Sequence, residues 1–235
     1  MSLLVPPRRP AAERLDDPRL PSDEMRRSLE DIRLVNRRFG GLPSLARHVL
    51  DRVRPPAGRG ARALVLDVGA GSGDVARRLE ATLRRAGCNA RVFALDLQWR
   101  HLAAGRTMSA DEPAPAVAAN AFRLPLADES VDFAVSTLFF HHFSPAENAA
   151  ILRELTRVAR RGFAVLDLRR NLVPWAFVAV VGRAIFRARI SVADGMASVR
   201  QAYTPEEAEA IARGVARGSR ARRVFPYRFL LEGGA

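Results

Sequence analysis

Short apolar runs alternate with segments of helical periodicity through the middle of the chain. Continuous apolar runs predict strands at Ala63–Val68, 91–95, 131–138 and Phe163–Leu168, with a weaker strand at 116–119. Between them, Asp74–Arg85 and 146–158 carry apolar residues at helical spacing and predict helices. Strands without polar alternation, separated by helices, are typical of a parallel sheet covered on both faces.

The pattern differs at the two ends of the chain. Residues 1–21 contain five prolines and predict a flexible tail. Helices are expected from 23 to about 39 and over 43–53, and 55–60 reads as a linker, so 22–58 is an expected N-terminal helical cap. The remaining residues, 59–235, form the main domain. Within it, the apolar run 172–186 predicts a helical insertion at about 172–200, and 224–231 an edge strand.

The clearest chemical signal follows the first predicted strand. Asp67 ends that strand, and Gly69, Gly71 and Gly73 then alternate with small residues before a helix begins at Asp74. Glycine permits a sharp turn and has no Cβ to exclude a ligand. In a doubly wound sheet this turn lies at the carboxyl edge of the strands, where ligands bind.

Two phosphate-binding interpretations of this turn fail. A dinucleotide-binding turn requires a third glycine at position 74, which is Asp74, and its carboxylate would repel a pyrophosphate. A P-loop requires lysine, and the chain contains none. A nucleoside without phosphates but with a charged amino-acid tail fits, as in S-adenosylmethionine. Asp96 ends the next strand, where an acid can accept both ribose hydroxyls, and Leu97 could pack on the adenine.

Taken together, these motifs resemble the class I methyltransferases, especially small-molecule methylases of the ubiquinone and menaquinone biosynthesis type. The resemblance covers roughly residues 60–170 and rests on 67–74, Asp96, 120–132 and 139–143. It implies S-adenosylmethionine as the cofactor. The fold we expect is α/β: a doubly wound, mostly parallel seven-stranded sheet with helices on both faces.

The resemblance also implies roles for matching residues. The backbone of Gly69, Ala70, Gly71 and Gly73 would pass the methionine tail, Asp67 would position that tail, and Asp96 would hold the ribose. Asn120, with the backbone of Ala121 and Phe122, would meet the adenine edge, although the family usually has Asp at this position. Ser136 completes the expected cofactor set. The segment 160–162 replaces the usual Pro-Gly-Gly turn.

The residues that would contact the methyl acceptor are less clearly indicated by the sequence. His141 and His142 end the fourth strand, where a histidine could take a proton from a phenol or enol, and we favour His141. A strand cap is an equally simple role for the pair. No third metal ligand is near in sequence, so no metal site is expected. Further substrate-binding candidates are Asp167, Arg169, Trp175 and Phe39; Asp167 could equally be a strand-end cap and the aromatics core residues.

Composition leaves more than one function class open. The formal charge of +13 invites a nucleic-acid partner, but all 38 basic residues are arginines spread along the chain, as in GC-rich coding. No nucleic-acid amino-methylase motif follows the fourth strand, and Cys88, the single cysteine, is misplaced for cytosine chemistry. We therefore expect methyl transfer to a small, apolar, aromatic acceptor such as a phenol, polyketide or quinone precursor. The alternatives are an RNA methyltransferase and a non-catalytic, cofactor-binding partner protein.

The remaining expectations concern the cellular setting. The N-terminal residues lack the apolar core of a signal peptide, and the single cysteine fits a reducing cytoplasm. The run 172–186 is too short to span a bilayer comfortably, although contact with a membrane surface is compatible with it. A monomer or a homodimer is expected.

Overall fold

The computed structural model describes residues 4–53, 62–109 and 112–234. These residues form a seven-stranded sheet with the strand order β3-β2-β1-β4-β5-β7-β6. Strands β1 to β5 are parallel, whereas β7 runs antiparallel to both β5 and β6. The strands are β1 Ala63–Val68, β2 Ala90–Asp96, β3 Ala116–Ala118, β4 Phe133–Thr137, β5 Phe163–Leu168, β6 Arg220–Val224 and β7 Arg228–Gly233. The predicted fold class is confirmed.

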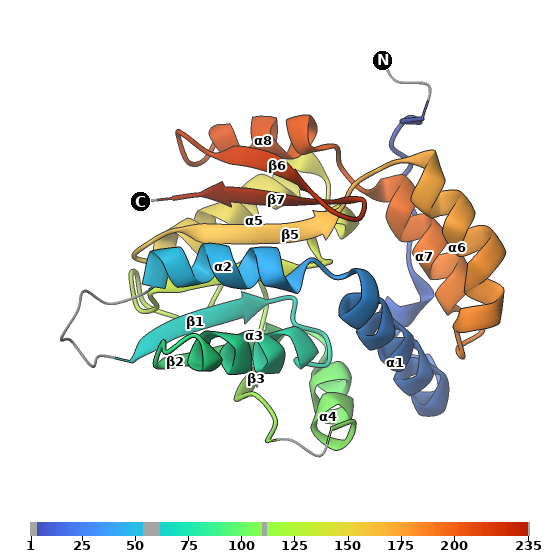
Figure 1. The fold of residues 1–235 in the computed structure, drawn as a ribbon, viewed down its shortest axis with the longest axis horizontal. Coiled ribbons are helices and arrows are strands. Elements are labelled where there is room, and N and C mark those ends of the chain that lie inside the picture. The colour runs from blue at the N-terminus through green and yellow to red at the C-terminus, as the bar shows by residue number, and fades with distance from the viewer. Residues whose placement is uncertain (1–3, 54–61, 110–111, 235) are drawn as a thin grey trace.

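Helices cover both faces of this sheet (Figure 1). One core packs α2 Leu42–Val53, α3 Asp74–Arg85 and α4 Trp99–Thr107 against one face. The other packs α5 Pro145–Val158 and α8 Pro205–Arg213 against the opposite face. Helices α5 and α8 begin with capping boxes, Ser144 with Glu147 and Thr204 with Glu207, which satisfy backbone amides at each helix start.

A third layer lies across the carboxyl ends of the parallel strands. It contains α1 Ser22–Phe39, α6 Leu172–Ile185 and α7 Ser191–Gln201, toward which the arrowheads of β1 and β5 point (Figure 1). A small core joins the N-terminal segment and α1 to the link between α6 and α7; it contains Leu15, Leu20, Met25, Leu29, Ala188 and Ile190. These helices therefore cap the edge of the sheet where ligands are expected.

Two regions differ from the sequence-based expectation. The run 224–231 forms parts of two strands, because the chain turns at Phe225–Tyr227 and β7 inserts between β5 and β6. The edge strand at this end of the sheet is β6, whose three arginines leave no apolar run; charged residues also protect an exposed edge from pairing with other chains. The linker predicted at 55–60 lies outside the described residues.

Residues 4–21, for which the sequence predicts a flexible tail, are tied to the cap and to the sheet edge. Arg8 Nη2 donates to the carbonyls of His141 (3.0 Å) and Phe143 (2.9 Å). The backbone amides of Arg14 and Leu15 both donate to the Asp194 carboxylate at 3.0 Å. Hydrogen bonds to backbone carbonyls and to a carboxylate far along the chain hold this segment in place, an arrangement that its proline-rich composition does not reveal.

Candidate functional site

The turn between β1 and α3 is formed by glycines with left-handed backbone. Gly69, Gly71 and Gly73 have φ values of +71°, +55° and +69°. A Cβ at Gly69 would lie 2.3 Å from the ring of Phe139, whereas a Cβ at Gly71 would meet no atom of the described residues within 4 Å. The turn is thus packed against an aromatic ring on one side and open at Gly71, where a ligand can approach the backbone.

Two carboxylates flank this turn in different environments. Asp96 accepts hydrogen bonds from the backbone amides of Gly71 (2.7 Å) and Gln98 (2.8 Å), so it ties the end of β2 to the glycine turn. Asp67 is fully buried, and neither carboxylate oxygen accepts a hydrogen bond of normal geometry among the described residues. Burial raises the pKa of Asp67 to about 8, and the nearby charge of Asp96 adds to the shift. A buried carboxylate of this kind suits a cationic group as partner.

Exposed apolar side chains lie beside Asp96. Leu97 is 68% exposed and Phe122 is 39% exposed. The Ala119 amide donates to the Asp96 carbonyl (3.0 Å), and Asn120 Oδ1 accepts from the Phe122 amide (2.9 Å), so the ends of β2 and β3 meet here. Of the other predicted cofactor residues, Ala70 bonds to the β2 carbonyl of Leu95, while Ala121 and Ser136 are buried. The structure therefore brings the predicted cofactor residues to one edge of the sheet.

The two predicted histidines lie in a short 3-10 turn, Phe140–His142, after β4. His141 Nδ1 lies 2.7 Å from Asp167 Oδ1, and the His141 amide donates to Asp167 Oδ2 (3.1 Å). Burial opposes a charge on His141, but the carboxylates of Asp167 and Glu13 outweigh it and raise the His141 pKa to about 10. His141 is therefore an imidazolium at neutral pH, held between two carboxylates.

His142 has the opposite electrostatic character. Its ring stacks on that of His141, with centroids 4.3 Å apart, and is tilted 6.5 Å from that of Phe139. Burial lowers the His142 pKa, and the positive charge of His141 lowers it further. Because Phe139 also packs on Gly69, one aromatic ring connects the glycine turn to a histidine that is neutral at neutral pH.

Residues that the sequence does not mark complete this end of the site. Glu13 Oε1 lies 3.5 Å from His141 Nε2, and Asp16 Oδ2 lies 3.4 Å from His142 Nδ1. The Asp16 carbonyl accepts from the side chain of Gln98, so the N-terminal segment reaches from the histidines to the end of β2. Glu13 and Asp16 belong to the expected tail, and nothing in their local sequence indicates this placement.

The same carboxylate places a third possible ligand beside the two histidines. Ligand atoms of Glu13, His141 and His142 all lie within 4.8 Å of one another. Glu13 Oε1, however, already accepts from Ser198 Oγ (2.6 Å) and Gln201 Nε2 (2.7 Å). Hydrogen bonds thus satisfy this carboxylate, and we interpret the group as a polar network that holds the N-terminal segment over the strand ends.

The other predicted substrate residues are spread over the cap. Phe39, at the end of α1, contacts Phe177 of α6 edge to face, with ring centroids 5.8 Å apart. Trp175 lies under the Arg200 guanidinium at 5.6 Å, and the Arg169 guanidinium lies over the ring of Tyr227 at 5.1 Å. Only Asp167 of this set directly contacts the histidine pair. Phe39 and Trp175 lie on helices of the cap, and Arg169 directly follows β5.

Arg228 is a further residue that sequence analysis missed. It begins β7, is fully buried, and donates from Nε to the Phe39 carbonyl (2.7 Å). Burial lowers its pKa to about 10, whereas the carboxylate of Asp167 acts in the opposite direction. Arg228 thus links the end of α1 to the sheet close to the buried Asp167.

Comparisons with known proteins agree with this geometry. Residues 66–166 match the family model described as a methyltransferase domain. A S-adenosylmethionine-dependent methyltransferase from Aquifex aeolicus shares 22% identity over 80% of this chain and 88% of its own, with a TM-score of 0.53. A methyltransferase structure from a Haloferax volcanii complex with the Trm112 activator shares 17% identity over 96% and 99%, with a TM-score of 0.58. Human N-acetylserotonin methyltransferase, solved with S-adenosylmethionine, shares 14% identity over 73% and 48%, with a TM-score of 0.52. No curated protein matches this sequence.

Proposed function

We propose that this chain is a class I S-adenosylmethionine-dependent methyltransferase and that it methylates a small, apolar acceptor carrying an aromatic or enolic hydroxyl. The observation that carries this proposal is the position of His142. This histidine lies beside Phe139, which packs on Gly69, and under a cap of helices with apolar side chains. A proton acceptor therefore lies next to the glycine turn, where the methyl donor is proposed to bind, and the apolar surroundings favour an apolar substrate.

The residues present fit S-adenosylmethionine. The Gly71 backbone faces open space, the buried oxygens of Asp67 and Ser136 have no partners among the described residues, and Leu97 offers an exposed apolar surface. We assign the methionine tail to the glycine turn and Asp67, the ribose to Asp96, and the adenine to Leu97, Asn120, Ala121 and Phe122. When bound, the cofactor supplies an electrophilic sulfonium methyl group.

The acceptor residues have separate tasks in this proposal. His142, neutral at neutral pH, takes the proton from the acceptor hydroxyl as its oxygen or ring carbon becomes the nucleophile. His141, which the sequence favours as the base, is charged and bonded to Asp167, so at neutral pH it has no lone pair free to take a proton; in this proposal it instead keeps its stacked neighbour neutral. The N-terminal segment, held by Glu13, excludes water from the strand ends, so the nucleophile is desolvated.

The proposal is tested by methyl transfer from labelled S-adenosylmethionine to a panel of alkylated phenols and enolic polyketides. We expect product with the wild type and about a 100-fold lower kcat for His142→Gln, the loss typical of a missing general base. Binding of S-adenosylhomocysteine should stay unchanged in this variant. The control is His48→Gln, because His48 lies on α2 and pairs with Glu232 instead.

Two results would contradict this assignment. Wild-type kcat in His142→Gln would remove His142 from the reaction. Transfer to structured RNA but to no member of the small-molecule panel, with a steep salt dependence of binding, would replace the acceptor class.

A further inference from the structure

Helix α6 exposes its apolar side chains to solvent. On this helix, Val180 is 75% exposed, and only Gly182 is buried. The helix contains a single charged residue, Arg183. A surface helix of a globular protein normally turns a polar face to water, whereas one that is apolar all round is covered by something else. The exposed large apolar residues of α6 are Leu172, Val173, Phe177, Val180 and Ile185.

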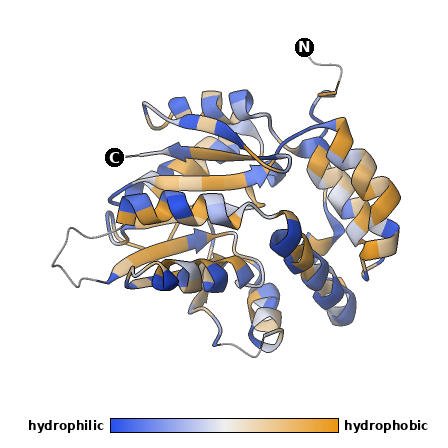
Figure 2. Ribbon diagram, in the orientation of Figure 1, coloured by the Kyte–Doolittle hydropathy of each residue, from blue (hydrophilic) through white to orange (hydrophobic). Residues whose placement is uncertain are grey.

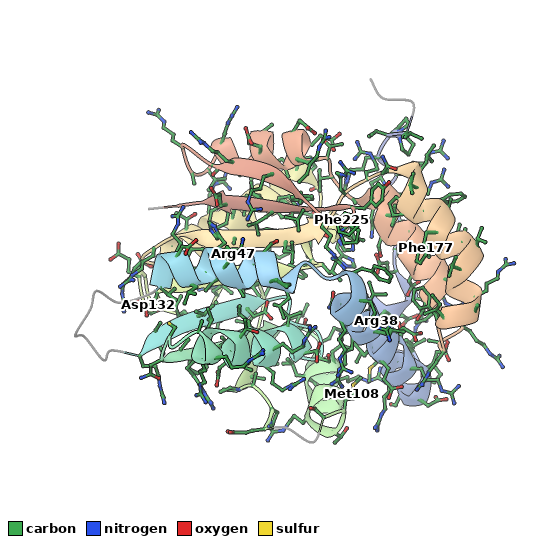
Figure 3. All side chains as sticks on the ribbon, in the orientation of Figure 1. Arg38, Arg47, Met108, Asp132, Phe177 and Phe225 are labelled. Carbon is green, nitrogen blue, oxygen red and sulfur yellow. The ribbon has the colours of Figure 1, made fainter. Side chains whose placement is uncertain are left out.

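This apolar surface continues onto neighbouring elements. Phe39, at the end of α1, is 40% exposed and contacts Phe177. Phe225, in the turn between β6 and β7, is 90% exposed. Figure 2 shows α6 as a largely hydrophobic helix on the outside of the cap, and Figure 3 labels Phe177 on α6 and Phe225 at the strand ends that face the cap. We call Phe39, Phe225 and the five exposed α6 residues the cap surface.

The charges around the cap surface have one dominant sign. The stretch 168–193 contains five arginines and no acidic residue. Arg183, Arg187 and Arg189 are exposed at the carboxyl end of α6, and Arg37 and Arg38 are exposed at the end of α1. Of these exposed arginines, Arg187 lies 3.8 Å from Glu30, a loose pair. An apolar surface bordered by guanidinium groups is complementary to a layer of acyl chains bordered by phosphates.

We propose that the cap surface docks on an anionic phospholipid bilayer. The exposed side chains of α6 and Phe225 enter the interface, while the arginines pair with lipid phosphates. Among the described residues no helix is long and apolar enough to cross a membrane, so the contact is peripheral. Because the cap lies over the strand ends, docking brings the acceptor end of the site close to a lipid phase that dissolves apolar acceptors.

A second copy of this chain is the competing occupant. Two cap surfaces packed face to face would bring the two sets of exposed arginines together, and like charges close together are unfavourable. The loose pairing of these arginines within one copy leaves them available for an external anion. Charge complementarity therefore favours the bilayer over self-association.

Vesicle flotation tests this inference without cofactor or acceptor, so its outcome is independent of the proposed reaction. The probes are vesicles of phosphatidylcholine alone and of phosphatidylcholine with phosphatidylglycerol. We expect the wild type to bind the anionic vesicles at least about ten-fold more strongly than the neutral ones. Val180→Glu should bind the anionic vesicles about ten-fold more weakly than the wild type does. The matched control is Val117→Glu, because Val117 is 46% exposed but lies on β3 at the edge of the sheet. Melting curves and S-adenosylhomocysteine binding verify that both variants are folded.

Three results overturn the inference. The first is wild-type protein that floats with neither vesicle. The second is equal binding by Val180→Glu and Val117→Glu, which would reduce the attraction to net charge alone. The third is a concentration-dependent dimer that Val180→Glu dissociates, without vesicle binding, which would assign the cap surface to a second copy.

Discussion

The donor end of the site, where S-adenosylmethionine is proposed to bind, is built from the backbone of one turn. The acceptor end, around the histidine pair, is built from side chains of separate segments. Gly69, Gly71 and Gly73 follow one another directly after β1, and Asp96 bonds to the amide of Gly71. At the acceptor end, His141 follows β4, Asp167 lies in β5 and Glu13 comes from the N-terminal segment. A backbone turn leaves little freedom to adjust, while a side-chain network can lose one member and keep its geometry.

This difference has consequences for substitution. At the donor end, a Cβ added to a glycine is strained by the positive φ of the backbone, and at Gly69 it would also collide with the packed ring of Phe139. At the acceptor end, Glu13 is held by Ser198 and Gln201 as well as by its contact with His141. We therefore expect the largest effects at the glycine turn and smaller ones at residues with several partners.

The largest effect is expected at the glycine turn, where Gly69→Ala can be compared with Gly71→Ala. Both positions have positive φ, which costs a side chain about 1–2 kcal/mol, but only at Gly69 does the new Cβ collide with Phe139. Overpacking adds about 1–3 kcal/mol, so Gly69→Ala should lose about 2–5 kcal/mol of unfolding free energy and Gly71→Ala about 1–2 kcal/mol. Chemical denaturation of the cofactor-free proteins measures both. Equal losses would show that Phe139 moves aside freely.

The donor end is easier to predict from sequence than the acceptor end, because its residues are contiguous. The turn from Asp67 to Asp74 is readable because strand, turn and helix are contiguous, and β2 places Asp96 at the same edge by parallel pairing. His141 and Asp167 could be predicted as candidates for the same reason, since both lie at the carboxyl ends of parallel strands. Glu13 and Asp16 could not be recognised, because their partners are far away in sequence and the local composition favours a loose segment.

The elements missed by sequence analysis have a common cause. Strand β6 consists mostly of arginines and is held by backbone pairing with β7 and by contacts with α8, neither of which is visible in one sequence. Helix α4 was not anticipated, because Trp99–Thr107 has only two buried residues and hence no clear apolar stripe. The charge state of His141 is set by two carboxylates that only the folded chain brings together.

The buried carboxylate at the donor end gives a pH-dependent prediction. The folded pKa of Asp67, about 8, lies above its ordinary value of 3.8, so between these values the folded state binds a proton that the unfolded state does not. Stability should therefore fall as the pH rises from about 4 to 8 and then level off. Asp67→Asn should remove this loss and be more stable than the wild type at pH 9, while weakening S-adenosylhomocysteine binding. Melting temperatures measured from pH 5 to pH 9 test the slope; parallel curves for both proteins would contradict it.

Substitutions at the two ends should affect S-adenosylhomocysteine affinity differently. Asp96→Ala removes the acceptor of two backbone hydrogen bonds and the proposed ribose contact, so S-adenosylhomocysteine affinity should drop about 30- to 100-fold, or about 2–3 kcal/mol. Glu13→Gln, at the acceptor end, should change the same affinity less than about three-fold, because Gln can still accept from Ser198. Calorimetric titration of both variants measures this. A comparable loss in Glu13→Gln would mean that the N-terminal segment holds the donor as well.

The smallest effect is expected at Asp74, the residue of the glycine-turn motif whose carboxylate forms structural ion pairs. Asp74 opens α3 directly after the glycine turn, but its carboxylate faces Arg33 of α1 at 3.2 Å, with Arg77 and Arg78 at 3.2 and 3.7 Å. Replacing one partner of an isolated buried pair costs about 3–5 kcal/mol, because the other charge is stranded. In Arg33→Met two arginines remain beside Asp74, so we expect about 1–2 kcal/mol of lost stability, including the bond from Arg33 to the Met108 carbonyl. S-adenosylhomocysteine affinity should not change, and the matched variant Arg19→Met, in an exposed pair with Asp17, should not shift the melting temperature. Weakened binding in Arg33→Met with normal stability would instead make α1 part of the donor site, and the contrast between a local donor end and an assembled acceptor end would no longer hold.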